Sequence, residues 1–254
     1  MAAVPSGYVR VEHTEAEVVA LASHAAAVRE ALAGGTLYQW AASHPERRVY
    51  SGRLPAYAAP LPGGGPRVVV RRAHHGGWLA TVTGDLFFPP TRAPRELEVS
   101  QRLEQAGILT PEVVAYAVYP AGPLLRRSEV ATREIAPAED LGAGLLAARD
   151  PDARRALLRL AGELLVALTR AGAWHPDLNV KNILLAPDQY GVRRAYLLDV
   201  DRVRFVAPGD VAAARANWAR LLRSARKWRA RHGAGFDEAE LGALCALASG
   251  RPEP

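Results

Sequence analysis

The stretch Trp174 to Leu185, with the sequence WHPDLNVKNILL, holds polar residues at a spacing that suits phosphoryl transfer. That reaction needs a carboxylate near the acceptor hydroxyl and oxygen ligands for Mg²⁺ beside the phosphates, because positioning and charge neutralisation dominate it. Asp177 and Asn182 share this predicted loop, and Asp199 ends an apolar strand that follows it. In kinase active sites such a loop carries the base at its start and a metal ligand at its end, and the next strand supplies a second ligand.

We therefore predict Asp177 as the catalytic base, and Asn182 and Asp199 as ligands of the Mg²⁺ that accompanies ATP. Mg²⁺ prefers oxygen ligands and keeps coordination positions for phosphate oxygens and water. The plainer interpretation, in which each residue only caps a turn, suits a lone Asp or Asn. Asp177, Asn182 and Asp199 together, each next to apolar residues and in this order, favour the catalytic interpretation. His175 is expected to support the loop through a backbone hydrogen bond rather than to act as a base, and Asp201 either binds a second metal or pairs with an arginine.

The surrounding elements change from strands to helices along the chain. Apolar spacing and turn residues predict the following series. It comprises a helix at 14–32, strands at 48–57, 67–72 and 78–83 in an antiparallel meander, a helix at 94–106, strands at 112–119 and 124–135, a helix at 151–171, a strand at 195–200, and helices at 210–231 and 236–249.

This order predicts an α+β fold of two lobes. Residues 1–45 are expected to form an N-terminal helical extension, residues 46–137 a small antiparallel β-rich N-lobe, and residues 138–254 an α-helical C-lobe. The change of composition between Pro137 and Gly144 marks the expected hinge.

The two motifs HPDLNVKNILL and LLDVDR together resemble the lipopolysaccharide kinase family, whose members phosphorylate 3-deoxy-D-manno-octulosonic acid (Kdo) or heptose in the lipid A inner core. Asn179 stands where ordinary protein kinases have lysine, and Asp201 stands where they have glycine. The likeness extends from about Arg48 to Arg229 and includes these further stretches: Val70–Gly77, Arg95-Glu96, Gly107–Pro111 and Asn217–Lys227.

The resemblance implies a protein-kinase-like fold, ATP and Mg²⁺ as cofactors, and a lipid-linked sugar as acceptor, with the Kdo 4-hydroxyl as the specific target. By position, Arg71 is the phosphate-pairing residue, Glu96 orients it, and Gly52 belongs to the turn that covers the nucleotide. Arginine can grip phosphate with its fork of donors. Two alternatives stay open: a kinase for a soluble or protein hydroxyl, and a non-catalytic pseudokinase.

Composition bears on location and partners. The formal net charge is +6, and the run from Arg215 to His232 is strongly basic, with Trp218 and Trp228 interleaved. Such a helix is either a solvated face or a surface for anionic lipid headgroups. No nucleic acid is expected, because the sequence lacks the motif of a nucleic-acid module. One cysteine, no secretory signal and no apolar span predict a cytoplasmic protein or one peripheral to a membrane. The resemblance to the lipopolysaccharide kinase family implies a place at the cytoplasmic face of the inner membrane.

Overall fold

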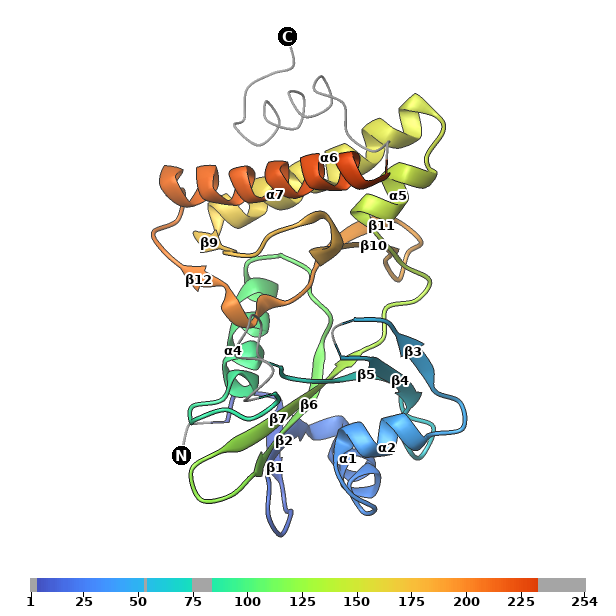
Figure 1. Cartoon of the computed structure of the whole chain (residues 1–254), viewed down its shortest axis with the longest axis vertical. Coiled ribbons are helices and arrows are strands. Elements are labelled where there is room, and N and C mark those ends of the chain that lie inside the picture. The colour runs from blue at the N-terminus through green and yellow to red at the C-terminus, as the bar shows by residue number, and fades with distance from the viewer. Residues whose placement is uncertain (1–3, 53, 75–83, 233–254) are drawn as a thin grey trace. The chain divides into compact units, whose positions relative to one another are not determined.

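The computed structural model describes residues 4–52, 54–74 and 84–232. Its contacts divide the chain into two compact units. The first comprises Met1–Glu98 and Pro111–Glu134, and the second comprises Val99–Thr110 and Ile135–Pro254. Figure 1 labels most of the helices and strands of both units. The three-part division expected from the sequence stays a prediction about separate domains.

The first unit is built on a seven-stranded sheet in the order β1-β2-β6-β7-β5-β4-β3, in which every neighbouring pair is antiparallel. Its strands are β1 (Tyr8–Val11), β2 (Glu17–Leu21), β3 (Arg48–Tyr50), β4 (Ala56–Pro60), β5 (Arg67–Arg72), β6 (Val113–Pro120) and β7 (Arg126–Arg133). Strands β3, β4 and β5 follow one another in an antiparallel meander, as expected from the sequence, although the strand expected at 48–57 is divided into β3 and β4. Strands β6 and β7 lie between β2 and β5. The strand expected at 78–83 lies outside the described residues.

The prediction of one helix from Thr14 to Leu32 is wrong. Glu17–Leu21 forms strand β2, a 3-10 turn follows, and helix α1 (Ala25–Ala31) begins only after it. The adjacent valines Val18 and Val19 favour a strand, and pairing on both sides with β1 and β6 satisfies its backbone. The N-terminal extension is therefore only partly helical, and its strands are part of the sheet.

Helix α2 (Leu37–Ser43) was not predicted, although its start signal stands in the sequence. The Thr36 side chain accepts from the Gln39 backbone N–H, and the Gln39 side chain accepts from the Thr36 backbone N–H. This reciprocal capping box satisfies two donors that a helix start otherwise leaves unpaired. Helices α1 and α2 pack on one apolar cluster with the sheet, while Ala93 and Leu97 of helix α4 (Arg92–Gln105) belong to another.

The second unit is mainly helical and carries short strands. Its elements are α5 (Leu141–Ala147), α6 (Pro151–Arg170), α7 (Val211–His232), β8 (Glu139–Asp140), β9 (Ala173–Trp174), β10 (Ile183–Pro187), β11 (Arg193–Leu197), β12 (Arg204–Phe205) and the 3-10 turns η2 (Val180–Asn182) and η3 (Val200–Arg202). Strands β11, β10 and β8 form one sheet, and β12 pairs with β9. The helix expected at 236–249 lies outside the described residues.

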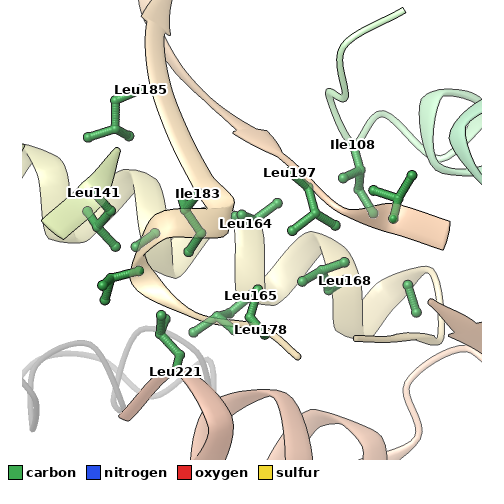
Figure 2. Packing of buried hydrophobic residues seen from close by; sticks show 14 of the residues in the cluster. Ile108, Leu141, Leu164, Leu165, Leu168, Leu178, Ile183, Leu185, Leu197 and Leu221 are labelled. Atoms are coloured by element: carbon green, nitrogen blue, oxygen red, sulfur yellow. The ribbon is translucent and has the colours of Figure 1, made fainter. Parts of the chain in front are cut away.

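Helix α6 agrees with its predicted range because the sequence marks both ends. The Asp150 carboxylate accepts from two backbone N–H groups of the first turn, and Pro151 needs no partner at the first helical position. Gly172, at φ +63°, follows the C-terminus. The apolar stripe of α6 lies in the main core with Leu178, Ile183 and Leu221 (Figure 2).

Helix α7 packs one face inward through Asn217, Leu221 and Ala225. Trp218 and Trp228 are partly buried and pack against the main core. All seven basic residues from Arg215 to Arg231 are exposed. No helix in the described ranges is both long and apolar enough to cross a membrane.

Candidate active site

The loop that carries Asp177 is anchored by His175, whose side chain is completely buried. The Asp177 backbone N–H donates to His175 Nδ1 at 3.2 Å. The ring proton therefore lies on Nε2, which donates to the Leu198 carbonyl at 3.2 Å. His175 thus ties the loop to the strand end that precedes Asp199, which is the supporting role predicted for it.

Asn217 of α7 holds the same loop from a second direction. Its Oδ1 accepts from the His175 backbone N–H at 2.8 Å, and its Nδ2 donates to the Ala173 carbonyl at 2.8 Å. Asn217 is 1% exposed. Buried polar groups are normally hydrogen-bonded, and both polar atoms of this amide have a partner. Asn217 is not among the residues predicted for the site. Its polar side chain on the apolar face of a helix was the available signal.

Asn182 lies at the end of the loop and is mostly buried. Its Nδ2 donates to the Asp177 carbonyl at 3.3 Å, which leaves Oδ1 without a hydrogen-bond partner in the part of the chain that the structure describes. The Asn182 carbonyl accepts from the Leu198 backbone N–H at 2.9 Å. One backbone hydrogen bond therefore brings Asn182 next to Asp199, its predicted fellow ligand.

Asp199 adopts the left-handed conformation, with φ 54° and ψ 46°, and no other non-glycine residue in the described ranges has a positive φ. This conformation costs an L-residue roughly 1–2 kcal/mol. A backbone conformation with this cost persists mainly where the surrounding structure fixes it, and such residues cluster at functional sites. The hydrogen bonds of Leu198 to Asn182 and His175 fix the residue just before it.

The donor set fits a magnesium ion bound with a nucleotide. Asn182 Oδ1 and the Asp199 carboxylate are hard oxygen ligands, and two protein ligands leave positions for phosphate oxygens and water. A group of three or more His, Cys, Asp or Glu side chains suited to a metal does not occur among the residues the structure describes. Asn182 and Asp199 therefore differ from a metal site in which protein side chains supply every ligand.

Arg202 forms an ion pair with the Asp177 carboxylate, a contact that the sequence analysis did not anticipate. Both side chains are about half exposed, at 51% and 42%. Exposed pairs of this kind contribute about 0–1 kcal/mol. The guanidinium can therefore leave the carboxylate at small cost. Its place in the LLDVDR motif was the signal for a link to the site.

Burial gives His175 a predictable effect on the pH dependence of stability. Desolvation lowers its pKa below the ordinary value, although the Leu198 hydrogen bond and nearby carboxylates oppose the shift. As the pH falls through about 6.5, His175 therefore takes up a proton in the unfolded chain but not yet in the folded chain. The free energy of unfolding then decreases until the pH reaches the lower pKa of the folded chain.

We expect the free energy of unfolding to fall between pH 7.5 and 5 by up to about 1.4 kcal/mol per pH unit from this group. In His175→Gln, the curve should be flatter over the same range, since the other titrating groups are shared. Urea unfolding at a series of pH values measures both curves. Parallel curves for the two proteins would contradict the assignment.

Arg71 and Glu96, the predicted phosphate-binding pair, lie together in the first unit. Arg71 is near the end of β5, and its guanidinium forms an ion pair with the Glu96 carboxylate of α4. Glu96 is 6% exposed and Arg71 is 34% exposed, so one side of the pair is buried and the other faces outward. The buried Glu96 carboxylate therefore restrains the direction in which the Arg71 guanidinium points.

Gly52 lies in the connection between β3 and β4, which pair as an antiparallel hairpin. It is exposed. A Cβ at this position would come within 3.0 Å of the Leu54 carbonyl oxygen, so a side chain here would crowd the turn. The assignment of Gly52 to nucleotide binding stays a prediction.

A matched pair of substitutions tests Arg71 and Glu96. Loss of the charged contact in Glu96→Gln is expected to raise the KM for ATP about tenfold, because a hydrogen bond to a charged group is worth about 1.5–3 kcal/mol. Glu134→Gln is the control, since Glu134 is similarly buried and accepts from Arg67 Nε on the same strand at 2.9 Å. Steady-state kinetics should give the control an unchanged KM for ATP. Equal effects of both variants would contradict a specific role.

The predicted residues thus fall into two groups. Asp177, Asn182 and Asp199 come together in the second unit through the hydrogen bonds of His175 and Leu198. Arg71, Glu96 and Gly52 belong to the first unit.

Comparison with known proteins gives a family match and a shared fold. The model of the lipopolysaccharide kinase (Kdo/WaaP) family matches residues 65–243, which is more than half of the chain. No curated protein sequence matches.

Among solved structures, WaaP in complex with acyl carrier protein is similar, with 20% identity, a TM-score of 0.57, and coverage of 88% of this chain and 86% of that one. The Rio2 kinase complex with ADP, Mg²⁺ and phosphoaspartate from Chaetomium thermophilum has 17% identity and a TM-score of 0.48, and covers 96% of this chain and 77% of that one.

Proposed function

Because the chain belongs to the lipopolysaccharide kinase (Kdo/WaaP) family, we propose that it transfers the γ-phosphoryl group of ATP to the 4-hydroxyl of Kdo on a lipid A precursor. Its α+β fold is protein-kinase-like, as the sequence resemblance implied. The observation that carries the proposal is the hydrogen-bonded arrangement of Asp177, Asn182 and Asp199 around His175 and Leu198.

In this proposal each side chain has one task. The Asp177 carboxylate accepts a hydrogen bond from the acceptor hydroxyl and takes up its proton as the oxygen attacks the γ-phosphorus, whose bond to the β–γ bridging oxygen breaks to release ADP. Asn182 Oδ1 and the Asp199 carboxylate would hold Mg²⁺, which would supply positive charge beside the phosphate oxygens. Arg71, directed by Glu96, pairs with phosphate. Most of the catalysis then comes from positioning and electrostatics, as expected for phosphoryl transfer.

The exposed basic face of α7 supports a place for the protein at an anionic membrane surface, on the cytoplasmic side of the inner membrane. The residues of this face are Arg215, Arg220, Arg223, Arg226 and Arg229. Each basic residue near such a surface contributes about 1 kcal/mol to binding. A lipid-linked sugar would then be presented where the enzyme is concentrated.

The experiment that tests this function is transfer of labelled γ-phosphate from Mg·ATP to a Kdo-bearing lipid A precursor. We expect product from the wild-type protein, phosphorylated at the Kdo 4-position by NMR, and none from Asp199→Ala. ATP binding without transfer would point to another acceptor or to a pseudokinase.

Charge reversal on α7 separates a membrane acceptor from a soluble one. Arg220→Glu with Arg223→Glu should reduce transfer to precursor in anionic vesicles but not transfer to precursor in neutral detergent. A kinase for a soluble compound would show no effect in either setting.

A further inference from the structure

The two lysines of the chain, Lys181 and Lys227, line one cavity of about 570 Å³ in the second unit. This lysine cavity lies between η2 with its preceding residue and the last turns of α7. The lining residues that matter here are Asn179, Lys181, Ser224, Lys227, Trp228 and Arg231.

The cavity is strongly positive. Lys181, Lys227 and Arg231 line it, and no Asp or Glu does. In the described part of the chain none of these three cations forms an ion pair with a carboxylate. All three are exposed, so an anion can reach them without disturbing the core. Within the described ranges these three cations have no carboxylate partner, and an anion bound between them would relieve their mutual repulsion.

Lysine at both positions stands out in this composition. The chain has 32 Lys and Arg residues, of which two are Lys, so 30 are Arg. A lysine ammonium is a compact charge with three rotatable donors, whereas a guanidinium is a wide planar fork. Both lysines of the chain therefore line the same hollow.

Trp228 gives the cavity a fixed apolar wall. The indole lies against Gly142 of α5, where a Cβ would come within 2.9 Å of its ring. The Lys181 ammonium lies 5.4 Å from the ring centroid, within the range of a cation–π contact. Trp228 Nε1 is buried and has no hydrogen-bond partner among the described residues, although buried donors usually have one.

Hydrogen bonds connect the cavity wall to the predicted catalytic loop. Asn179 Nδ2 donates to the Asp177 carbonyl at 2.8 Å, and Asn179 Oδ1 accepts from the Lys181 backbone N–H at 2.9 Å. On the other side, Ser224 Oγ accepts from the Val180 backbone N–H at 3.2 Å. The wall is therefore hydrogen-bonded to the loop that carries Asp177.

We propose that the lysine cavity binds an anionic group of the acceptor, a carboxylate or a phosphate monoester, and so sets which acceptors reach Asp177. The proposal deepens the proposed function and rests on it. A sugar acid such as Kdo carries a carboxylate, and a lipid A precursor carries phosphate. The shared chemistry is a compact anion that receives hydrogen bonds from two ammonium groups, with the indole wall beside it.

The test uses the full-length protein and the double variant Lys181→Gln with Lys227→Gln. The matched control is Arg149→Gln with Arg159→Gln, which removes the same charge from exposed positions of the second unit outside the cavity. We expect the double variant to raise the KM for the acceptor about tenfold, since hydrogen bonds from charged donors are lost. The KM for ATP and the melting temperature should match the control.

A second arm measures binding without turnover. Titration calorimetry with free Kdo and with inorganic phosphate should show binding to the wild type and the control, and none to the lysine variant. The methyl ester of Kdo lacks the carboxylate charge and should not bind to the wild type, the control or the lysine variant. Binding of phosphate but not Kdo would identify a phosphate of the acceptor as the bound group, and the reverse would identify the carboxylate.

The outcomes separate this proposal from the proposed function. Unchanged acceptor KM and anion binding in the lysine variant would overturn the cavity as a subsite, even if transfer to the Kdo precursor is observed. Anion binding that depends on the lysines, without transfer to the Kdo precursor, would support the anion site and overturn the proposed acceptor. If anionic phospholipid vesicles bind through the two lysines and free anions do not compete, the cavity is a lipid contact and the proposal fails.

Discussion

Substitution of Asp177 by Asn is expected to lower kcat for phosphoryl transfer about a thousandfold, because general-base catalysis typically contributes 10²–10⁴-fold. Asn has nearly the same shape but cannot take up the hydroxyl proton. The backbone groups of residue 177 would keep their hydrogen bonds to His175, Asn179 and Asn182. The loop should therefore stay in place, and the KM for ATP should change little. Initial rates at saturating Mg·ATP measure the effect.

The control for this prediction is Asp152→Asn. Asp152 is exposed on α6 and pairs with Arg155, so it also loses an ion pair with arginine. Its kcat should equal that of the wild type. A kcat for Asp177→Asn above one tenth of the wild-type value, with an unchanged melting temperature, would show that Asp177 is not the base.

Substitution of Gly172 by Ala should have the largest effect on stability, at roughly 3–5 kcal/mol. Gly172 lies between α6 and β9 with φ +63°, and a Cβ there would come within 2.4 Å of the Val206 carbonyl oxygen and 2.8 Å of the Ala207 carbonyl oxygen. Both neighbours are backbone atoms, so relief requires movement of the chain next to β12. The Gly172 carbonyl accepts from the Val206 backbone N–H at 2.8 Å, and this contact would also be disturbed.

Gly191→Ala separates the two causes of this loss. Gly191 has φ +77°, and a Cβ there would have no atom within 4 Å. Its substitution should cost only the left-handed conformation, roughly 1–2 kcal/mol. Urea unfolding of both variants gives the difference. Equal losses would mean that the close approach at Gly172 has no energetic weight.

Local signals in the sequence were enough to predict several elements. Helix α6 is bounded by Asp150-Pro151 at one end and Gly172 at the other, and strand β5 agrees with its predicted range of Arg67–Arg72. The region Glu17–Leu21 was misassigned because its apolar spacing also suits a helix. Its pairing with β6 lies about a hundred positions away in sequence (Glu17 with Val118), and local periodicity carries no information about such a partner.

In the candidate site, too, residues within short motifs could be predicted, whereas contacts between segments far apart in sequence could not. Asp177, Asn182 and Asp199 were predicted from two short motifs, because each motif keeps its residues close along the chain. Arg202 and Asn217 were missed as partners of this site, although both stand in stretches that resemble the family. Their roles depend on an ion pair to Asp177 and on hydrogen bonds from another helix, which only the folded chain specifies.

The course of the chain through the two units has a consequence for folding during synthesis. The segment Val99–Thr110 belongs to the second unit although residues of the first unit precede and follow it. Its buried residues Val99, Leu103 and Ile108 pack in a cluster that otherwise comes from Leu141 to Ala225. On the ribosome these three side chains emerge before their packing partners exist. Nascent chains expose such apolar surface until the partners arrive, so this segment stays without its packing partners until residues 141–225 have been synthesised.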